Sequence, residues 1–153
     1  MTFELAKTAS DFLVNNLHIK KDLGFISQNA TAEITFFGGE PTLCWDTIIV
    51  PLVTYLETTY PEEVGFAITT NGTLLNEDKI KYLYDHRISP LLSIDGAPKT
   101  QDFNRPCKDQ CLSSSELVLK NIPTLLKYFP NTTFRSTIDQ ESVGNTFENY
   151  IFA

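Results

Sequence analysis

The chain has 153 residues with a formal net charge of -7, and 42% of its residues are hydrophobic and 20% charged. This composition is that of a globular domain large enough to bury a core, and it excludes a disordered chain. The acidic balance argues against a broad surface for nucleic acids or anionic membranes. No apolar run approaches the roughly 20 residues of a membrane span. No signal peptide opens the chain, so we expect a cytoplasmic protein.

Hydrophobic periodicity predicts helices that alternate with short strands. Runs of β-branched and aromatic residues predict the strands, and apolar residues at helical spacing predict the helices. Residues 97–112 are polar and are expected to form a long loop, while Pro123 is expected to kink the helix that contains it. The expected helices cover residues 2–17, 45–56, 77–87, 113–129 and 143–152, and the expected strands cover residues 33–37, 64–69, 90–94 and 132–138.

The alternation of strands with helices predicts an α/β fold with a parallel sheet and right-handed crossovers. Four parallel strands are too few to close an eight-stranded barrel. We therefore expect residues 1–153 to form a single partial parallel (β/α) barrel that is truncated at both ends. An open sheet leaves edges that must be covered, so a homo-oligomer is one possible arrangement.

Unusual residues follow each predicted strand, at the edge of a parallel sheet where ligands bind. Taken alone, each of these groups is more typical of a turn or of a solvated surface. Together they would line one concave face, which favours a binding site. The groups are Gly38-Gly39-Glu40-Pro41, Thr69-Thr70-Asn71-Gly72, Ser93-Ile94-Asp95-Gly96 with Asp102 and Arg105 behind it, and Arg135 on the last strand.

The group after the first strand carries the most specific chemistry. Two glycines, Gly38 and Gly39, allow a ligand to approach the backbone closely. Glu40 places a carboxylate where it can accept hydrogen bonds from a ligand ammonium, and Pro41 stiffens the exit of the chain. These residue types predict a site for a small molecule with a cationic group.

The ordered set of motifs resembles the radical S-adenosylmethionine superfamily, and most closely its branch of peptide- and sulfatase-maturing enzymes. The motifs are ITFFGGEPTL at 34–43, ITTNGTLL at 68–75, LSIDG at 92–96 and QDFNRP at 101–106. The resemblance covers nearly the whole chain and implies a TIM-barrel-like radical SAM fold. It also implies an oxidoreductase that uses S-adenosylmethionine and a [4Fe–4S] cluster to generate a 5′-deoxyadenosyl radical.

The resemblance also implies roles for the residues at the strand ends. Gly38, Gly39 and Glu40 would meet the methionine part of S-adenosylmethionine, with Glu40 receiving its ammonium. Ser93, in the motif that contains Asp95, would contact the methionine carboxylate or the ribose. Thr70 and Asn71 would line the same pocket. Arg105, with Asp102, would order the loop over the pocket or pair with a carboxylate.

The cysteines depart from the pattern of the family, which ligates its cluster through Cys-x3-Cys-x2-Cys ahead of the Gly-Gly-Glu-Pro motif. The chain contains three cysteines, and none precedes Phe37. Cys107 and Cys111 reproduce half of the spacing but follow the third strand, so we expect two ordinary thiols there and no metal site. Cys44 is expected to pack beside Trp45.

The sequence therefore predicts a fragment of a radical S-adenosylmethionine enzyme that modifies a peptide or protein, inactive by itself because the cluster ligands are missing. One alternative is a non-catalytic module, derived from the same fold, that binds a peptide or a partner protein. Another is an unrelated α/β-barrel enzyme that uses Glu40 or Asp95 as an acid or base. No Walker-type loop or paired-histidine motif supports this last alternative.

Overall fold

The computed structural model describes residues 1–108, 112–138, 140 and 143–152. Among these residues, parallel strands form one open sheet in the order β1-β2-β3-β4. The strands are β1 (Ala32–Phe36), β2 (Val64–Thr70), β3 (Ile88–Ser93) and β4 (Thr133–Arg135). The helices are α1 (Phe3–Asp22), α2 (Val50–Thr59), α3 (Glu77–Asp85), α4 (Pro98–Asn104), α5 (Ser114–Leu119), α6 (Ile122–Tyr128) and α7 (Thr146–Phe152). The predicted α/β class and the parallel strands are confirmed.

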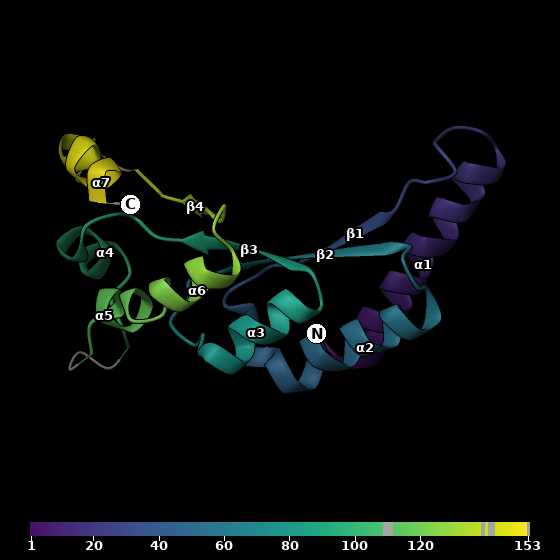
Figure 1. Cartoon of the computed structure of the whole chain (residues 1–153), viewed down its shortest axis with the longest axis horizontal. Coiled ribbons are helices and arrows are strands. Elements are labelled where there is room, and N and C mark those ends of the chain that lie inside the picture. Colours follow the sequence, from purple (N-terminus) through teal and green to yellow (C-terminus); the bar gives the residue numbers. More distant parts are fainter. Residues whose placement is uncertain (109–111, 139, 141–142, 153) are drawn as a thin grey trace.

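The helices cover one face of the sheet. Figure 1 shows α1, α2, α3 and α6 together on one side of the strands. The main core lies between these helices and the sheet, where alternate residues of β2, Phe66 and Ile68, are buried beside Leu92 of β3. The alternation of buried residues along β2 is what a strand with a single apolar face requires.

The opposite face of the sheet is polar. Glu33 and Thr35 of β1 and Ser89 of β3 are exposed there, and α7 is the element that Figure 1 shows on this side, beyond the end of β4. Parallel sheets in open folds are usually covered on both faces. The polar side chains on this face can meet solvent or a ligand.

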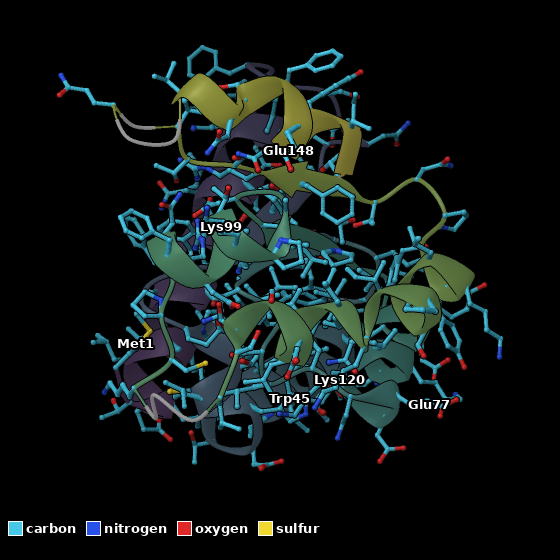
Figure 2. All side chains as sticks on the ribbon, turned by 90° about the vertical axis from the view of Figure 1, so that its left-hand side faces the viewer. Met1, Trp45, Glu77, Lys99, Lys120 and Glu148 are labelled. Atoms are coloured by element: carbon cyan, nitrogen blue, oxygen red, sulfur yellow. The ribbon has the colours of Figure 1, made fainter. Side chains whose placement is uncertain are left out.

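The strand register brings the carboxyl ends of all four strands to one edge of the sheet. Phe36 pairs with Ile68, Thr70 with Leu92 and Ser93 with Arg135. Figure 2 views the molecule from this edge, with Glu148 of α7 on one side of the sheet and Trp45 and Lys120 on the other. The motifs that follow the strands therefore lie along a common rim.

A network of polar side chains fastens α1 to α2. The hydroxyls of Tyr55 and Tyr60 donate to Oδ1 of Asp11 at 2.8 and 3.1 Å, and Lys7 pairs with Oδ2 at 3.0 Å. Burial and the hydrogen bond to Asp11 raise the pKa of Tyr60 to about 12.

α1 also runs to Asp22, beyond the predicted end at residue 17. Within the described residues, no helix is long and apolar enough to cross a membrane.

The predicted loop over residues 97–112 is wrong in its first half, which forms α4. Pro98 occupies the first turn of this helix, where its missing amide hydrogen is not needed and its fixed φ suits the helix. Gln101 is buried and accepts a hydrogen bond from the amide of Asp95 at 2.8 Å. This tertiary contact fixes a helix too short to be stable by itself.

The predicted helix over residues 113–129 is two helices, α5 and α6, rather than one kinked helix. Pro123 stands in the first turn of α6, which avoids the lost hydrogen bond that a proline in a helix interior would cause. Asn121 lies at the break and donates to the carbonyls of Leu75 and Leu117 at 2.9 and 3.2 Å.

The last predicted strand, over residues 132–138, is shorter than expected and ends at Arg135. The next residues turn away to bond Asp95: Ser136 donates to its carbonyl at 3.3 Å, and the amide of Thr137 donates to its carboxylate at 2.9 Å. Because the Thr137 amide donates to the Asp95 carboxylate, it does not pair with a neighbouring strand, and β4 ends before it. The final helix, α7, begins at Thr146, three residues after the predicted start.

Candidate functional site

Glu40 is held by hydrogen bonds from two neighbouring strand ends. It caps the short helix Pro41–Cys44, and its Oε1 accepts from the amide of Thr42 at 3.1 Å and from its hydroxyl at 2.5 Å. The same oxygen accepts from the Thr70 hydroxyl at 2.7 Å, and Oε2 accepts from the amide of Asn71 at 2.8 Å. One carboxylate thus joins the exits of β1 and β2.

The glycines before Glu40 leave their backbone open. Gly38 has a φ of +127°, a conformation that side chains rarely adopt, and both Gly38 and Gly39 are exposed. A Cβ atom built on either glycine would meet nothing within 4 Å. The open space beside this backbone is what a ligand would need to reach its amides and carbonyls.

Asp95 forms the centre of a second group at the exit of β3. Its carboxylate is only 2% exposed and receives two hydrogen bonds from Arg105, from Nε at 2.8 Å and from Nη2 at 3.0 Å. Burial alone would raise the pKa of Asp95, but the bonds from Arg105 and from the Thr137 amide outweigh it, and the pKa lies below its ordinary value. Asp95 therefore joins the exits of β3 and β4 as an ion, much as Glu40 joins those of β1 and β2.

Asp102 of α4 binds the serines at the start of α5. Its carboxylate accepts hydrogen bonds from the hydroxyls of Ser113, Ser114 and Ser115 and from the amide of Ser115, at 2.7–3.1 Å. Burial opposes the charge, yet these bonds lower the pKa of Asp102 below its usual range. The expectation that Arg105 and Asp102 order a loop over the pocket or pair with a carboxylate stays a prediction. In this structure Arg105 pairs with Asp95 of the chain itself.

A cavity of about 440 Å³ lies between the exits of β3 and β4 and α7. Asp95, Gly96 and Thr137 line it from the strand ends, and Asn149 and Tyr150 line it from α7. Asn149 is buried against Gly96, and its Oδ1 accepts from the amide of Ala97 at 3.1 Å. Asp95 places a carboxylate in the wall of this cavity.

The structure gathers the predicted site residues into two separate groups. Glu40, Thr70 and Asn71 are in direct contact, and so are Asp95 and Arg105. Among the described residues, no hydrogen bond joins one group to the other. Ser93 is half-buried as the last residue of β3, beside the exposed Arg135 of β4, while Pro41 starts the helix that Glu40 caps.

Sequence reasoning missed Thr42, Asn149 and the serines that hold Asp102. The signal for Thr42 was present, because a threonine two residues after a helix-capping glutamate lies within reach of its carboxylate. Asn149 had no comparable signal, since it lies 53 positions after Gly96 in the sequence. Its contact depends on how α7 docks.

Two of the three cysteines, Cys44 and Cys107, lie in the described part of the chain. Cys44 is exposed, so the prediction that it packs beside Trp45 is wrong, and Cys107 is partly exposed. The prediction that Cys107 and Cys111 are ordinary thiols without a metal site includes Cys111, which lies outside the described part of the chain. Within the described part, no three side chains of histidine, cysteine, aspartate or glutamate lie where they could hold a metal ion.

Comparison with known families identifies related sequences. The family model described as the radical SAM superfamily matches residues 16–146. An uncharacterized protein of Methanocaldococcus jannaschii is 33% identical over 110 residues, which cover 71% of this chain and 34% of the relative. A cysteine-type anaerobic sulfatase-maturating enzyme of Clostridium novyi is 29% identical over 112 residues, which cover 72% of this chain and 29% of the enzyme.

Solved structures share the fold. The structure of native anSMEcpe with bound AdoMet superposes with a TM-score of 0.68 at 24% identity, over 82% of this chain and 35% of that chain. The same protein with bound AdoMet and Cp18Cys peptide gives a TM-score of 0.70 at the same identity and coverage. This chain therefore has the architecture of part of that barrel, and it spans about a third of the length of the proteins it matches.

Proposed function

Since the chain belongs to the radical S-adenosylmethionine superfamily, we propose that it forms part of the S-adenosylmethionine-binding core of an enzyme that modifies a peptide or protein. The observation that carries the proposal is the carboxylate of Glu40, fixed at the rim of the sheet beside the open backbone of Gly38 and Gly39. A held carboxylate next to accessible carbonyls suits the ammonium of an amino-acid ligand.

The residues present fit the amino-acid end of S-adenosylmethionine. Gly38 and Gly39 offer backbone groups to the ligand, Glu40 supplies the negative charge, and Ser93 supplies a hydroxyl at the end of β3. S-adenosylmethionine bound to a reduced iron–sulfur cluster would supply the radical that abstracts hydrogen from the substrate. The contribution of this chain is to bind and orient the ligand and to exclude water from it.

The described residues do not fit a cluster site of three cysteine ligands, and we derive no step through one. The sequence contains Cys44, Cys107 and Cys111, without the Cys-x3-Cys-x2-Cys spacing. We therefore expect these 153 residues alone to be inactive. Anaerobic reconstitution with iron and sulfide tests this: a stable [4Fe–4S] spectrum together with cleavage of S-adenosylmethionine would refute it.

A peptide or protein is the proposed substrate of the whole enzyme. One relative is named as a sulfatase-maturating enzyme, and one structural neighbour binds a peptide together with AdoMet. The polar face of the sheet, with Glu33, Thr35 and Ser89 exposed, would supply hydrogen-bonding groups to such a substrate. The relatives support a peptide or protein substrate by similarity, and the polar face supports it by its hydrogen-bonding groups.

Isothermal titration calorimetry with S-adenosylmethionine tests the ligand site in this chain directly. We expect weak binding that Glu40→Ala abolishes. The matched control is Glu77→Ala, which removes an exposed carboxylate from the first turn of α3 (Figure 2) and should leave binding unchanged. Absence of binding by the unmodified chain, or undiminished binding by Glu40→Ala, would overturn the proposal.

A further inference from the structure

The two carboxylate oxygens of Glu40 accept different numbers of hydrogen bonds from the chain. Oε1 accepts three hydrogen bonds, from the amide and hydroxyl of Thr42 and from the hydroxyl of Thr70. Oε2 accepts one, from the amide of Asn71. An ionised carboxylate offers about two acceptor positions on each oxygen. Oε1 is therefore saturated by the chain, and Oε2 keeps a position for a ligand.

The two threonines that saturate Oε1 cannot reach a ligand themselves. Thr42 is 3% exposed and Thr70 is 1% exposed. Thr70 lies on the helix-covered face of β2, in line with Phe66 and Ile68, and its Oγ1 also accepts from the amide of Gly72 at 3.0 Å. Thr70 thus links Glu40 to the turn that follows β2.

We infer that Thr42 and Thr70 are positioning residues, which hold Oε1 of Glu40 so that Oε2 faces the ammonium of the ligand. This inference rests on the proposed function. A free glutamate side chain loses rotamer freedom when it binds an ion, whereas a carboxylate that is already held loses little. Loss of either hydroxyl should therefore weaken binding of the ammonium although neither hydroxyl touches it.

The substitutions Thr42→Val and Thr70→Val remove the hydroxyls while keeping the branched shape of the side chain. The matched control is Ser10→Ala in α1, which removes a hydroxyl of similar burial that donates to the carbonyl of Ala6 at 2.9 Å. Thr70→Ser keeps the hydroxyl and should behave like the unmodified chain. A loss that Thr70→Ser shares with Thr70→Val would assign the effect to packing and overturn the inference.

The first measurement needs no ligand. Amide hydrogen exchange at Asn71 should accelerate about tenfold in Thr70→Val, because Glu40, which accepts from this amide, is no longer held by the Thr70 hydroxyl. Exchange at Gly72 should accelerate as well, because its amide loses the Thr70 hydroxyl as its acceptor. Ser10→Ala should leave exchange at these amides unchanged. If Thr42→Val and Thr70→Val also leave it unchanged, the link between the strand ends does not exist and the inference is overturned.

The second measurement compares two ligands. Both valine variants should bind S-adenosylmethionine about tenfold more weakly. They should bind 5′-methylthioadenosine, which lacks the ammonium, as the unmodified chain does.

Combining Thr70→Val with Glu40→Gln should add little to the loss of Glu40→Gln alone, because the threonine acts through the glutamate. Equal weakening of both ligands, or additive losses, would refute the positioning role while the proposed function stands. Failure of the unmodified chain to bind S-adenosylmethionine would overturn both, and the exchange result would still decide whether the link exists.

Discussion

Replacing Arg105 with alanine would leave the buried carboxylate of Asp95 without its cationic partner. The guanidinium donates two hydrogen bonds to this carboxylate, and without them the carboxylate keeps the bond from the Thr137 amide but has no cation beside it among the described residues. Because Asp95 is 2% exposed, water cannot readily replace the lost donors. The exits of β3 and β4, which Asp95 joins, should therefore lose stability.

The size of the effect follows from burial. Breaking a fully buried ion pair costs about 3–5 kcal/mol. The side chain of Arg105 is 30% exposed, so solvent already weakens part of the interaction. We expect Arg105→Ala to lower the free energy of unfolding by about 3 kcal/mol at neutral pH, or the melting temperature by roughly 6–12 °C.

The pH dependence separates this pair from ordinary packing. The folded state lowers the pKa of Asp95, so the stability that this group contributes is present above its ordinary pKa of 3.8 and is lost as the pH falls through the folded value. Urea unfolding should show the difference between Arg105→Ala and the unmodified chain in full at pH 7 and diminished below about pH 4.

The matched control for this experiment is Lys99→Ala, which removes an exposed cation from α4 (Figure 2) and should change stability by less than about 0.5 kcal/mol. A loss below about 1 kcal/mol for Arg105→Ala, or a loss that stays the same at acid pH, would show that Asp95 does not depend on Arg105. The assignment of this pair as the bond between the two strand exits would then be wrong.

Two further predictions concern contacts between distant segments. Gly96→Ala places a Cβ atom 2.3 Å from that of Asn149 at a φ of +127°, so α7 should undock; faster amide exchange over residues 146–152 would show this, and unchanged exchange would contradict the packing. Tyr60 should titrate near pH 12 in an ultraviolet absorbance titration, and Asp11→Asn should lower that value toward 10. Because the folded state raises the pKa of Tyr60, the stability it contributes is present below pH 10 and is lost as the pH rises toward 12; a midpoint near 10 in the unmodified chain would contradict the contact with Asp11.

The order of strands and helices could be predicted from the sequence, because each element carries a local pattern. Phe66 and Ile68 alternate with less buried residues, and Asn76, a residue type that favours helix N-caps, caps α3 and accepts from the amide of Lys79 at 2.9 Å. The positions of Glu40 and Asp95 at strand exits followed from the same patterns, since parallel strands present their carboxyl ends at one edge.

Helix α4 and the early end of β4 could not be predicted, because both depend on contacts between residues distant in the sequence. α4 depends on the bond between Gln101 and the Asp95 amide, and β4 ends early because Thr137 serves the Asp95 carboxylate. No local pattern encodes these partners. Short helices and edge strands are marginal by themselves, so tertiary contacts decide where they begin and end.

The sequence by itself determined the alternating α/β order, the parallel sheet and the set of residues at its rim, because hydrophobic period and glycine-rich turns are local properties. Only the tertiary structure decided which hydrogen-bond partners those residues have at the rim. Glu40 and Asp95 stand at the rim as predicted, yet their oxygens are occupied mainly by Thr42, Thr70 and Arg105. A buried charge must be satisfied by whichever donors the fold brings within reach, and that choice is made only when the strands are in register.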